Sequence, residues 1–457
     1  MPDPGLTLIS LAAALAASFG GAPAEATWKA GVARAAITPE EPLWLAGYAA
    51  RDRPAEGKIH DLWVKALALE DARGRRAVVV TSDLLGFPKA MYETIARDVG
   101  TACGIDRASF VLTSSHTHSG PVLEKALSPC YPLGDDQIER IRAYSRWLEK
   151  EVVRTVARAV ESLAPARLEA GEGSAGFAAN RRNNREADVA RLRAEGRELA
   201  GPSDRRVPVL AVRAADGRLL AVVFGYACHN TTLDTYLWCG DYAGFAQIAL
   251  ERKHEGAQAM FWSGCGADQN PLPRRKVELC EAYGEELARA VEAALSGDLR
   301  RLAPEIETAF RFVDLDLEPL PPRAEIEALL EKGIPYQKRW ARAVLDGLER
   351  GEEFPKSYPL PVHAWRLGED QLWIALGGEV VVDYALRFAK EFGPRTWVAG
   401  YTDDVMAYIP SRRIQEEGGY ESGAMQVYGL PAPGWTRDVE DRIAKAVREL
   451  AERVSRR

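Results

Sequence analysis

The sequence predicts an α/β protein in which central mixed β-sheets are flanked by helices. Three observations predict this fold class. Short apolar runs bounded by glycine and turn residues, which are typical of buried strands, recur along the chain. Amphipathic stretches of helical periodicity alternate with these runs. Neither an internal repeat nor a low-complexity linker interrupts the alternation. We therefore expect a single domain over residues 27–457.

Strand character is clear in the first hundred residues. Gly31–Pro39 ends in proline, which cannot donate a hydrogen bond to a neighbouring strand, so we expect an edge strand there. Residues 62–70 and 76–82 are apolar runs on either side of Asp71–Gly74, a pattern that predicts a hairpin. Later strands are expected in residues 168–224, outside a polar loop at 180–205, and in residues 305–317.

Helical periodicity, with apolar residues recurring every three or four positions, marks six further segments. The longest is residues 136–162, in which Ile141, Leu148, Val152 and Val156 would share one face. We expect two helices in residues 324–348 and one helix in each of the other five segments. The six segments are residues 89–99, 136–162, 241–252, 276–295, 324–348 and 437–453.

Composition excludes one class of partner. Of the 457 residues, 47% are hydrophobic, which is normal for a globular protein with a large core, and the net charge is -7. Nucleic-acid-binding proteins carry a basic face, whereas charged segments such as residues 181–197 and 339–356 mix both signs. We therefore expect no nucleic-acid partner.

The N-terminus has features of an export signal. Leu6–Phe19 is an apolar, alanine-rich stretch, and small residues suited to cleavage follow it at Ala24 and Ala26. No lysine or arginine precedes the stretch, so an alanine-rich first helix is the alternative. We predict a signal peptide over residues 1–26 and an exported protein, either periplasmic or secreted.

Six cysteines follow the predicted signal peptide, and none is spaced as a CxxC zinc ligand pair. An exported chain can pair its cysteines, but six of them allow fifteen connectivities, so sequence cannot choose among them. Buried free thiols are the equal alternative. The cysteines are Cys103, Cys130, Cys228, Cys239, Cys265 and Cys280.

Polar side chains follow five of the predicted strands, at the point where each strand ends. Open α/β sheets bind ligands outside the carboxyl ends of their strands. Five strands that each supply His, Asp, Glu, Asn or Tyr at that end therefore predict one composite site. The segments are His116–Pro121, Cys228–Thr232, Ser263–Pro271, Gly377–Glu379 and Tyr401–Asp404.

Three of these segments hold candidate metal ligands. His116 and His118 are two positions apart, and side chains at that spacing on a strand point the same way. Zinc in hydrolases takes three or four protein ligands and leaves a position for water, so His116, His229 and Glu379 are the best ligand candidates. His118 would then support the ligands or donate a proton. The alternative is that these are ordinary turn and capping residues.

The segment after residue 262 offers hydrogen-bonding groups. We expect Asp268, Gln269 and Asn270 to supply hydrogen-bond donors and acceptors around the substrate. A covalent nucleophile is a rival hypothesis, for which Ser119, Cys228 and Cys265 are candidates. The sequence contains no GxSxG motif, which counts against a serine nucleophile of the α/β-hydrolase type.

These residues occur in motifs through which the chain, over roughly residues 29–430, resembles the catalytic domain of neutral/alkaline non-lysosomal ceramidases. The sharpest motif is His116-Thr-His-Ser-Gly-Pro121. The other motifs are individually weak but follow the family's order. They are Gly31–Pro39, Ile59–Leu67, Ala179–Arg181, Ala227–His229, Gly240–Gly244, Gly377–Glu379, Tyr408–Ser411 and Tyr420–Glu421.

The resemblance implies a zinc amidase that splits the N-acyl bond of ceramide through a metal-activated water. It implies one zinc ion per chain, held by His116, His229, Glu379 and Tyr408. It also implies that His118, Arg181 and Tyr420 stabilise the reacting amide, because donors aimed at the carbonyl oxygen lower the barrier as negative charge develops there. A lipid-like substrate would bring the protein into peripheral contact with a membrane.

Three departures from the family pattern bear on the substrate. Gln269 stands where the family has a serine implicated in catalysis, and glutamine cannot act as a nucleophile. Pro410 and Arg412 replace a threonine-rich stretch, and the resemblance stops before the family's C-terminal immunoglobulin-like domain. Three hypotheses therefore stay open: hydrolysis of a ceramide-like or other N-acylated amide, an esterase or lactonase on the same metal site, and an inert exported binding module. The sequence does not indicate the oligomeric state.

Overall fold

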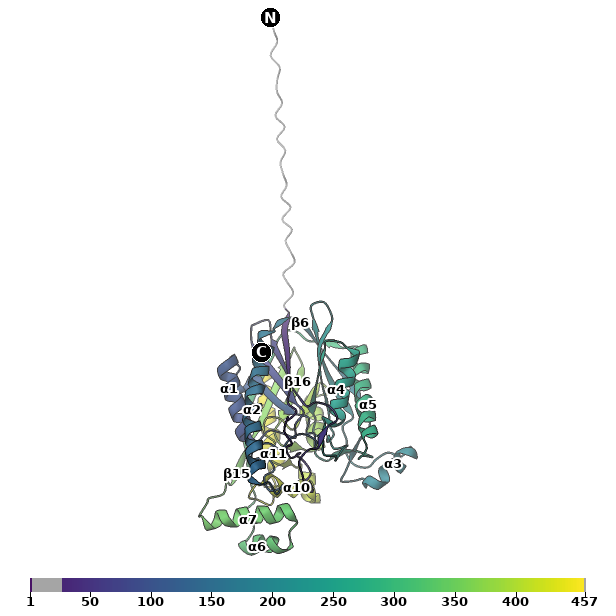
Figure 1. Cartoon of the computed structure of the whole chain (residues 1–457). Helices are drawn as coiled ribbons and strands as arrows, with labels where there is room; N and C mark the ends of the chain where they lie inside the picture. The colour runs from purple at the N-terminus through teal and green to yellow at the C-terminus, as the bar shows by residue number, and fades with distance from the viewer. Residues whose placement is uncertain (2–26, 456–457) are drawn as a thin grey trace.

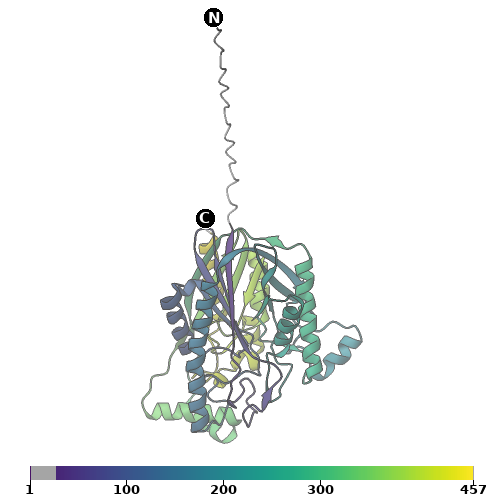
Figure 2. The same cartoon turned by 45° about the horizontal axis from the view of Figure 1, so that its top comes forward.

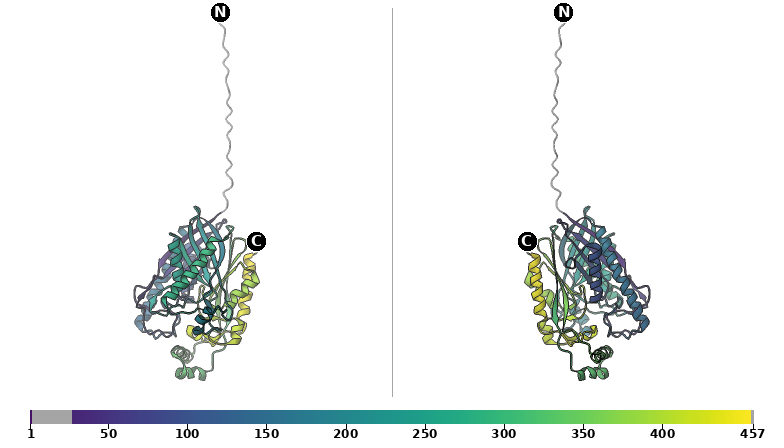
Figure 3. Two further views of the ribbon diagram at one scale, coloured as in Figure 1. Left: turned by 90° about the vertical axis from the view of Figure 1, so that its right-hand side faces the viewer. Right: turned by 90° about the vertical axis from the view of Figure 1, so that its left-hand side faces the viewer.

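The computed structural model describes residue 1 and residues 27–455, so the rest of the predicted signal peptide lies outside the described residues (Figure 1). Two β-sheets pack face to face, and helices cover both outer sides, which gives four layers (Figure 3). This arrangement confirms the predicted fold class of mixed sheets flanked by helices. Within the described part of the chain, no helix is long and apolar enough to cross a membrane.

The larger sheet has nine strands and mixed pairing. β4 and β5 are parallel, as are β9 and β11, and the remaining neighbours are antiparallel. The predicted hairpin is present, since β3 and β4 pair antiparallel. The Asp71 carboxylate stabilises its turn by accepting hydrogen bonds from the backbone N–H groups of Arg73 and Arg75. In spatial order the strands are β11 (Gln258–Ser263), β9 (Leu219–Tyr226), β8 (Arg206–Ala214), β6 (Ala164–Ser174), β1 (Trp28–Ala36), β3 (Trp63–Glu70), β4 (Arg76–Ser82) and β5 (Phe110–Ser114), with β13 (Arg300–Arg301) beside β6.

The prediction that the first strand is an edge strand is wrong. β1 lies inside the sheet, between β3 and β6. Its pairing with β6 covers only Trp28–Ala30, whereas its pairing with β3 runs to Ala36. The rest of β1 therefore has no partner strand on the β6 side among the described residues. There α2 approaches so closely that a Cβ at Gly31 would lie 2.2 Å from the carbonyl oxygen of Ala159. Sequence shows the strand but not which partners flank it.

The smaller sheet packs its inner face on the larger one. Alternate residues of a strand point to opposite faces, so each sheet contributes one set of apolar side chains to the interior between them. Trp373 of the smaller sheet lies with its ring centroid 5.7 Å from Trp262 of the larger sheet and 5.8 Å from its neighbour Trp365. The strands, in spatial order, are β14 (Ile306–Asp316), β15 (Ser357–Leu367), β16 (Gln371–Leu376) and β18 (Thr396–Ala399).

Helices form the outer layers. α2 and α5 lie over the larger sheet and are drawn in blue and teal in Figure 2, while α11 covers the smaller sheet. α6 and α7 form a hairpin that projects at the lower end of Figure 1. The helices are α1 (Lys89–Cys103), α2 (Asp135–Glu161), α3 (Glu186–Ala194), α4 (Asp241–Lys253), α5 (Val277–Ser296), α6 (Arg323–Lys332), α7 (Pro335–Glu349), α8 (Val382–Phe392), α9 (Arg412–Glu417), α10 (Tyr420–Gly423) and α11 (Val439–Ser455), with 3-10 turns η1 (Arg107–Ser109) and η2 (Gln426–Tyr428).

All six predicted helical segments are helical, and α6 and α7 are the expected pair. The polar loop predicted at 180–205 is partly wrong, because α3 lies within it. Three further two-stranded pairings bring distant loops together near the carboxyl ends of the main strands. They are β2 (Gly57–Lys58) with β10 (Leu237–Trp238), β7 (Ala178–Asn180) with β12 (Gln269–Pro271), and β17 (Glu379–Val380) with β19 (Tyr408–Ile409).

The carboxyl ends of β5 and β9 meet, although five strands of the larger sheet separate them in its order. Its two edge strands, β5 and β11, contact each other, so the sheet is strongly curved. Beyond the strand ends, the Asn230 amide donates a 2.6 Å hydrogen bond to the Ser115 carbonyl, and Thr117 forms a bridge with Asn230. This curvature brings His116 and His229 together.

Candidate metal centre

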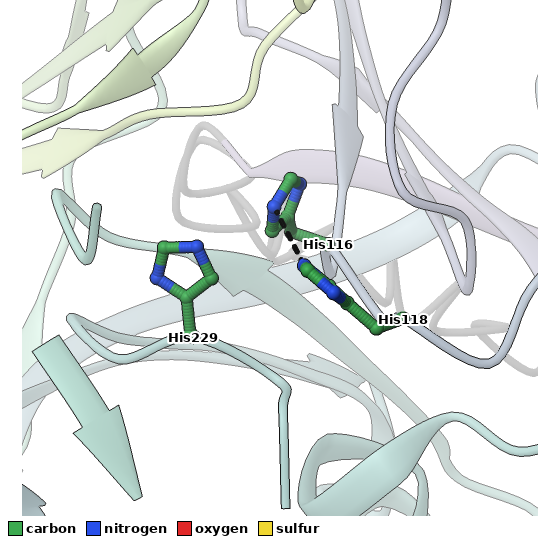
Figure 4. A group of neighbouring side chains, drawn as sticks. All are labelled: His116, His118 and His229. Carbon is green, nitrogen blue, oxygen red and sulfur yellow. Dashed lines mark hydrogen bonds between the residues drawn. The ribbon is translucent and has the colours of Figure 1, made fainter. Parts of the chain in front are cut away.

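Three buried imidazoles converge at the carboxyl ends of the strands. Nε2 of His116 lies 3.3 Å from Nε2 of His118, and one nitrogen from each of His116, His118 and His229 lies within 4.8 Å of the others (Figure 4). His116 and His229 are at most 1% exposed, and His118 is 9% exposed. Buried polar groups this close to one another form a set that can hold a metal ion.

The Glu379 carboxylate completes this set. Its Oε2 atom lies 3.2 Å from Nε2 of His116 and 3.1 Å from Nε2 of His229. Ligand atoms about 2.0 Å from a tetrahedral zinc ion are about 3.3 Å apart, so these spacings are those of metal ligands as well as of hydrogen bonds. The donor set of two imidazole nitrogens and one carboxylate oxygen fits zinc and leaves room for further ligands.

Backbone carbonyls fix which ring nitrogens face the centre. Nδ1 of His116 donates to the carbonyl oxygen of Leu85 at 2.6 Å, and Nδ1 of His229 donates to that of Gly266 at 2.8 Å. Both Nε2 atoms therefore face the centre, where each can offer a lone pair to a metal ion or, when it carries a proton, donate to the Glu379 carboxylate. Nδ1 of His118 is buried and lacks a hydrogen-bond partner among the described residues. His118 is thus oriented less firmly than the other two.

The geometric reason predicted for the His116–His118 pair is wrong. β5 ends at Ser114, before either histidine, so strand alternation does not align them. The backbone of His116 instead adopts a positive φ of 60°, and its ring packs on Tyr401 with centroids 4.3 Å apart. Left-handed backbone is rare for residues other than glycine and concentrates at functional sites, where surrounding contacts hold it. A tight turn therefore brings the two rings together.

Burial sets the protonation states of the cluster. Burial, with Arg181 nearby, lowers the pKa of His229 to about 4. Burial and the neighbouring imidazoles also hold the pKa of His118 well below its usual range. Burial opposes the ionisation of Glu379, but the attraction and hydrogen bonds of His116 and His229 outweigh it and lower the pKa of Glu379. Neutral imidazole and ionised carboxylate are the forms that bind metals.

Tyr408, Arg181 and Tyr420 lie beside the cluster. Tyr408 is directly opposite Glu379 in the parallel pairing of β17 with β19. Nη2 of Arg181 donates to the Tyr408 hydroxyl at 3.3 Å, and Nε donates to the Glu421 carboxylate at 2.7 Å. The Tyr408 and Tyr420 rings are 5.2 Å apart, centroid to centroid. The structure therefore brings together all the residues that the family resemblance singled out.

Asp268 and Gln269 lie behind the centre. The Asp268 carboxylate accepts hydrogen bonds from the backbone N–H of Val382 and the amide of Asn180, both at 2.9 Å. The Gln269 side-chain amide donates to the Pro202 carbonyl, and the backbone carbonyl of Gln269 accepts the backbone N–H of His229. Among the described residues that line the cavity, this segment contributes Asn270 and neither of these two. The geometry gives them a supporting place, and their predicted catalytic roles stay predictions.

A cavity of about 770 Å³ opens from the histidine cluster. Its lining is unusually charged, with four arginines and four glutamates beside a few apolar side chains and tyrosines. Most of these charges are paired; Arg274, for example, holds Glu186 at 2.8 Å. The charged lining residues are Arg181, Arg182, Arg274, Arg275, Glu186, Glu379, Glu417 and Glu421.

The rival nucleophiles are poorly placed. All six cysteines are free thiols in the described part of the chain. Cys228 and Cys265 are fully buried, and burial raises the pKa of each thiol well above its usual range. Ser119 is also buried, and its hydroxyl has no hydrogen-bond partner among the described residues that would activate it. None of the three lines the cavity as the described residues form it.

Sequence reasoning missed one residue of the site, Tyr428, and assigned no particular role to Tyr401. Tyr428 lines the cavity and donates a hydrogen bond to Oε1 of Glu379. Tyr401 packs on His116 and has a positive φ of 52°. The segment containing Tyr401 was expected at the site, but nothing in the sequence singled out Tyr428, which lies in the 3-10 turn η2.

Comparisons with known proteins identify the family and the fold. A sequence profile described as neutral/alkaline non-lysosomal ceramidase, N-terminal, matches residues 28–316, more than half of the chain. The crystal structure of neutral ceramidase from Pseudomonas aeruginosa superposes with a TM-score of 0.69 at 20% identity, over 95% of this chain and 76% of that one. A structure titled ceramidase complexed with C2 gives 0.68 at 18% identity, over 93% and 76%. No curated protein sequence matches. The chain therefore belongs to the neutral/alkaline non-lysosomal ceramidase family, and that membership implies hydrolase activity.

Proposed function

We propose that the protein is a zinc-dependent amidohydrolase that cleaves the N-acyl bond of an N-acylated substrate. The proposal rests on the convergence of His116, His229 and Glu379. The Nε2 atoms of the two histidines lie 3.2 and 3.1 Å from Oε2 of Glu379. A bound zinc ion would polarise an amide carbonyl and make water a nucleophile at neutral pH. His116, His229, Glu379 and Tyr408 would hold the ion.

The remaining residues would act on the amide itself. Arg181 is positively charged and partly exposed to the cavity, so its guanidinium can donate to a carbonyl oxygen as negative charge develops there. Tyr420 lines the same wall, with Arg181 over its ring. His118 is held neutral by burial, and it can take a proton from water and pass it to the departing nitrogen.

The charged lining favours an amide with a polar part over a ceramide with two long chains. Burying an alkyl chain gains about 0.8 kcal/mol per CH2 group only where the wall is apolar. Here a few side chains, including Leu85, Leu127, Leu272 and Val427, offer such a wall. We therefore propose a substrate with a short or single acyl chain, attached to a polar amine. An amide of this kind does not require the protein to bind a membrane surface.

The proposal is tested by hydrolysis with and without metal. Chelator-treated protein would be reloaded with zinc, manganese or iron and offered ceramide, N-acyl amino acids and the matching esters. We expect amide hydrolysis that depends on metal and falls by more than about 100-fold in His116→Ala, since even the supporting residues of a metal site contribute about 10–100-fold. His254→Gln is the control, because His254 lies outside the site and bonds to Glu292.

The outcomes separate the rival hypotheses. Amide hydrolysis at full rate by metal-free protein would refute the proposal. Turnover of esters alone would favour an esterase or lactonase on the same site. Metal binding without turnover of any substrate would favour an inert binding module.

A further inference from the structure

Tyr428 makes a contact that the proposed mechanism does not use. Its hydroxyl donates to Oε1 of Glu379, the carboxylate oxygen that faces away from the two histidines. The other oxygen, Oε2, lies 3.2 Å from His116 and 3.1 Å from His229. The two oxygens of one buried carboxylate therefore have different partners. The phenol holds one oxygen, and the metal-ligand histidines approach the other.

Without the phenol, the carboxylate would have more freedom. A carboxylate can bind a metal ion through one oxygen or through both, and a tilt of the group through its side-chain torsions converts one mode into the other. A hydrogen bond to Oε1 opposes that tilt, because moving Oε1 toward the ion would take the acceptor away from a half-buried phenol. Ligand carboxylates in metal sites are commonly restrained in this way.

The position of Tyr428 is itself fixed by the projecting helix α7. Nε1 of Trp340 donates to the Leu430 carbonyl at 2.8 Å, two residues beyond Tyr428. The Arg339 guanidinium donates to the carbonyls of Pro129 at 2.6 Å and Cys130 at 2.5 Å. The Cys130 thiol in turn lies 3.6 Å from the Val427 carbonyl, to which it donates. α7 thus anchors the segment that carries Tyr428 from two sides.

We infer that Tyr428 is a positioning residue that restrains Glu379 to binding the metal through Oε2 alone, and that α7 holds Tyr428 in place to do so. The inference rests on the proposed metal site. It assigns a role in metal binding to a residue outside the ligand set, and it gives the α6–α7 hairpin a function. Restraining Glu379 to one oxygen keeps a coordination position free for water or substrate.

The test compares Tyr428→Phe with Tyr358→Phe. Tyr358 is a matched control because its hydroxyl donates to another buried carboxylate, that of Asp404, at 2.7 Å, and both tyrosines line a neighbouring cavity of about 330 Å³. Metal-free forms of both variants would be titrated with Zn2+ against a chromophoric chelator. We expect Tyr428→Phe to bind Zn2+ about 10–100-fold more weakly than wild type, the usual effect of losing such a partner. Tyr358→Phe should bind Zn2+ as wild type does.

A second measurement reports geometry directly. Co2+ substituted for Zn2+ gives visible absorption bands that change in intensity with coordination number. We expect weaker bands for Tyr428→Phe, because both carboxylate oxygens could then bind, and unchanged bands for Tyr358→Phe. Trp340→Phe loosens the anchor of Tyr428, so it should shift affinity and spectrum in the same direction by a smaller amount.

Wild-type affinity and wild-type bands in Tyr428→Phe would overturn the inference while leaving the proposed metal site standing. Wild-type Zn2+ affinity and wild-type Co2+ bands in Trp340→Phe would refute the role assigned to α7. Wild-type protein that takes up neither ion would overturn the proposed function, and the inference with it.

Discussion

Glu421 offers a sharp test of how the site is built, through the substitution Glu421→Gln. Its carboxylate is 3% exposed and accepts hydrogen bonds from Arg181 at 2.7 Å and from Arg182 at 2.6 Å. Removing the charge leaves the largely buried Arg181 guanidinium without its counter-ion, while Arg182 keeps Glu417. Breaking a buried pair in this way costs about 3–5 kcal/mol, because the remaining charge is only partly resolvated.

Glu417→Gln is the matched control. Glu417 pairs with the same Arg182 at 3.0 Å, but its side chain is 40% exposed. Solvent screens such a pair, so its loss should cost about 1 kcal/mol or less. Both variants would be unfolded with urea in the metal-free form, and the free energies of unfolding compared. We expect Glu421→Gln to be less stable than Glu417→Gln by about 2–4 kcal/mol.

The same pair of variants reports on activity. Arg181 loses its anchor in Glu421→Gln, and misplacing a substrate-contacting group by about 1 Å can cost about 100-fold in rate. We therefore expect a lower kcat in Glu421→Gln and a wild-type kcat in Glu417→Gln. Two variants of equal stability and equal kcat would refute the view that Glu421 holds Arg181 in place.

Three further predictions follow from the same contacts. Removing metal with a chelator should lower the Tm by several degrees, since ligand at 100 times its Kd stabilises by about 2.7 kcal/mol, and His229→Asn should abolish that difference. Burial raises the pKa of Asp404 to about 7. The folded state then binds a proton that the unfolded state releases near pH 4, so urea unfolding should show about 4 kcal/mol of stability lost as pH rises from 4 to 7, but not in Asp404→Asn. Denatured, unreduced protein should titrate six thiols with a thiol reagent.

Much of the fold could be predicted, because its signals are local. The β3–β4 hairpin is encoded by two apolar runs and the Asp71 turn between them, and α2 by a long apolar stripe. α8 was missed because Glu379 is followed by three consecutive valines, which favour strand and hide the start of the helix. The place of β1 inside the sheet depends on β6, more than 120 residues away, and no local pattern encodes such a pairing.

In the site, too, some residues could be predicted from local sequence and others could not. The residues that closely follow strands, including His116, His229 and Glu379, could be predicted, because the ends of apolar strands are recognisable in the sequence. Tyr428 could not, since its contact with Glu379 spans 49 positions and it sits in a short turn held by α7. The positive φ of His116 was equally invisible, because histidine carries no sequence signal for left-handed backbone.

The cluster depends on both sheets at once. The carbonyl that orients His116 belongs to Leu85, just after β4, and the one that orients His229 belongs to Gly266, just after β11. Glu379 begins the short strand β17, just after β16 of the smaller sheet. The ligand atoms therefore meet only when the two sheets are packed, and a metal ion bound there would stabilise the packed arrangement over any state in which the sheets separate.

The side chain of Gln269 does not take part in this arrangement. It bonds to Pro202 behind the cluster and, in the described part of the chain, makes no hydrogen bond to any of the three ligand side chains. A substitution of this side chain can therefore leave the arrangement of His116, His229 and Glu379 intact. This is why the ligand set, rather than the residue at position 269, is the firmer guide to the activity of this chain.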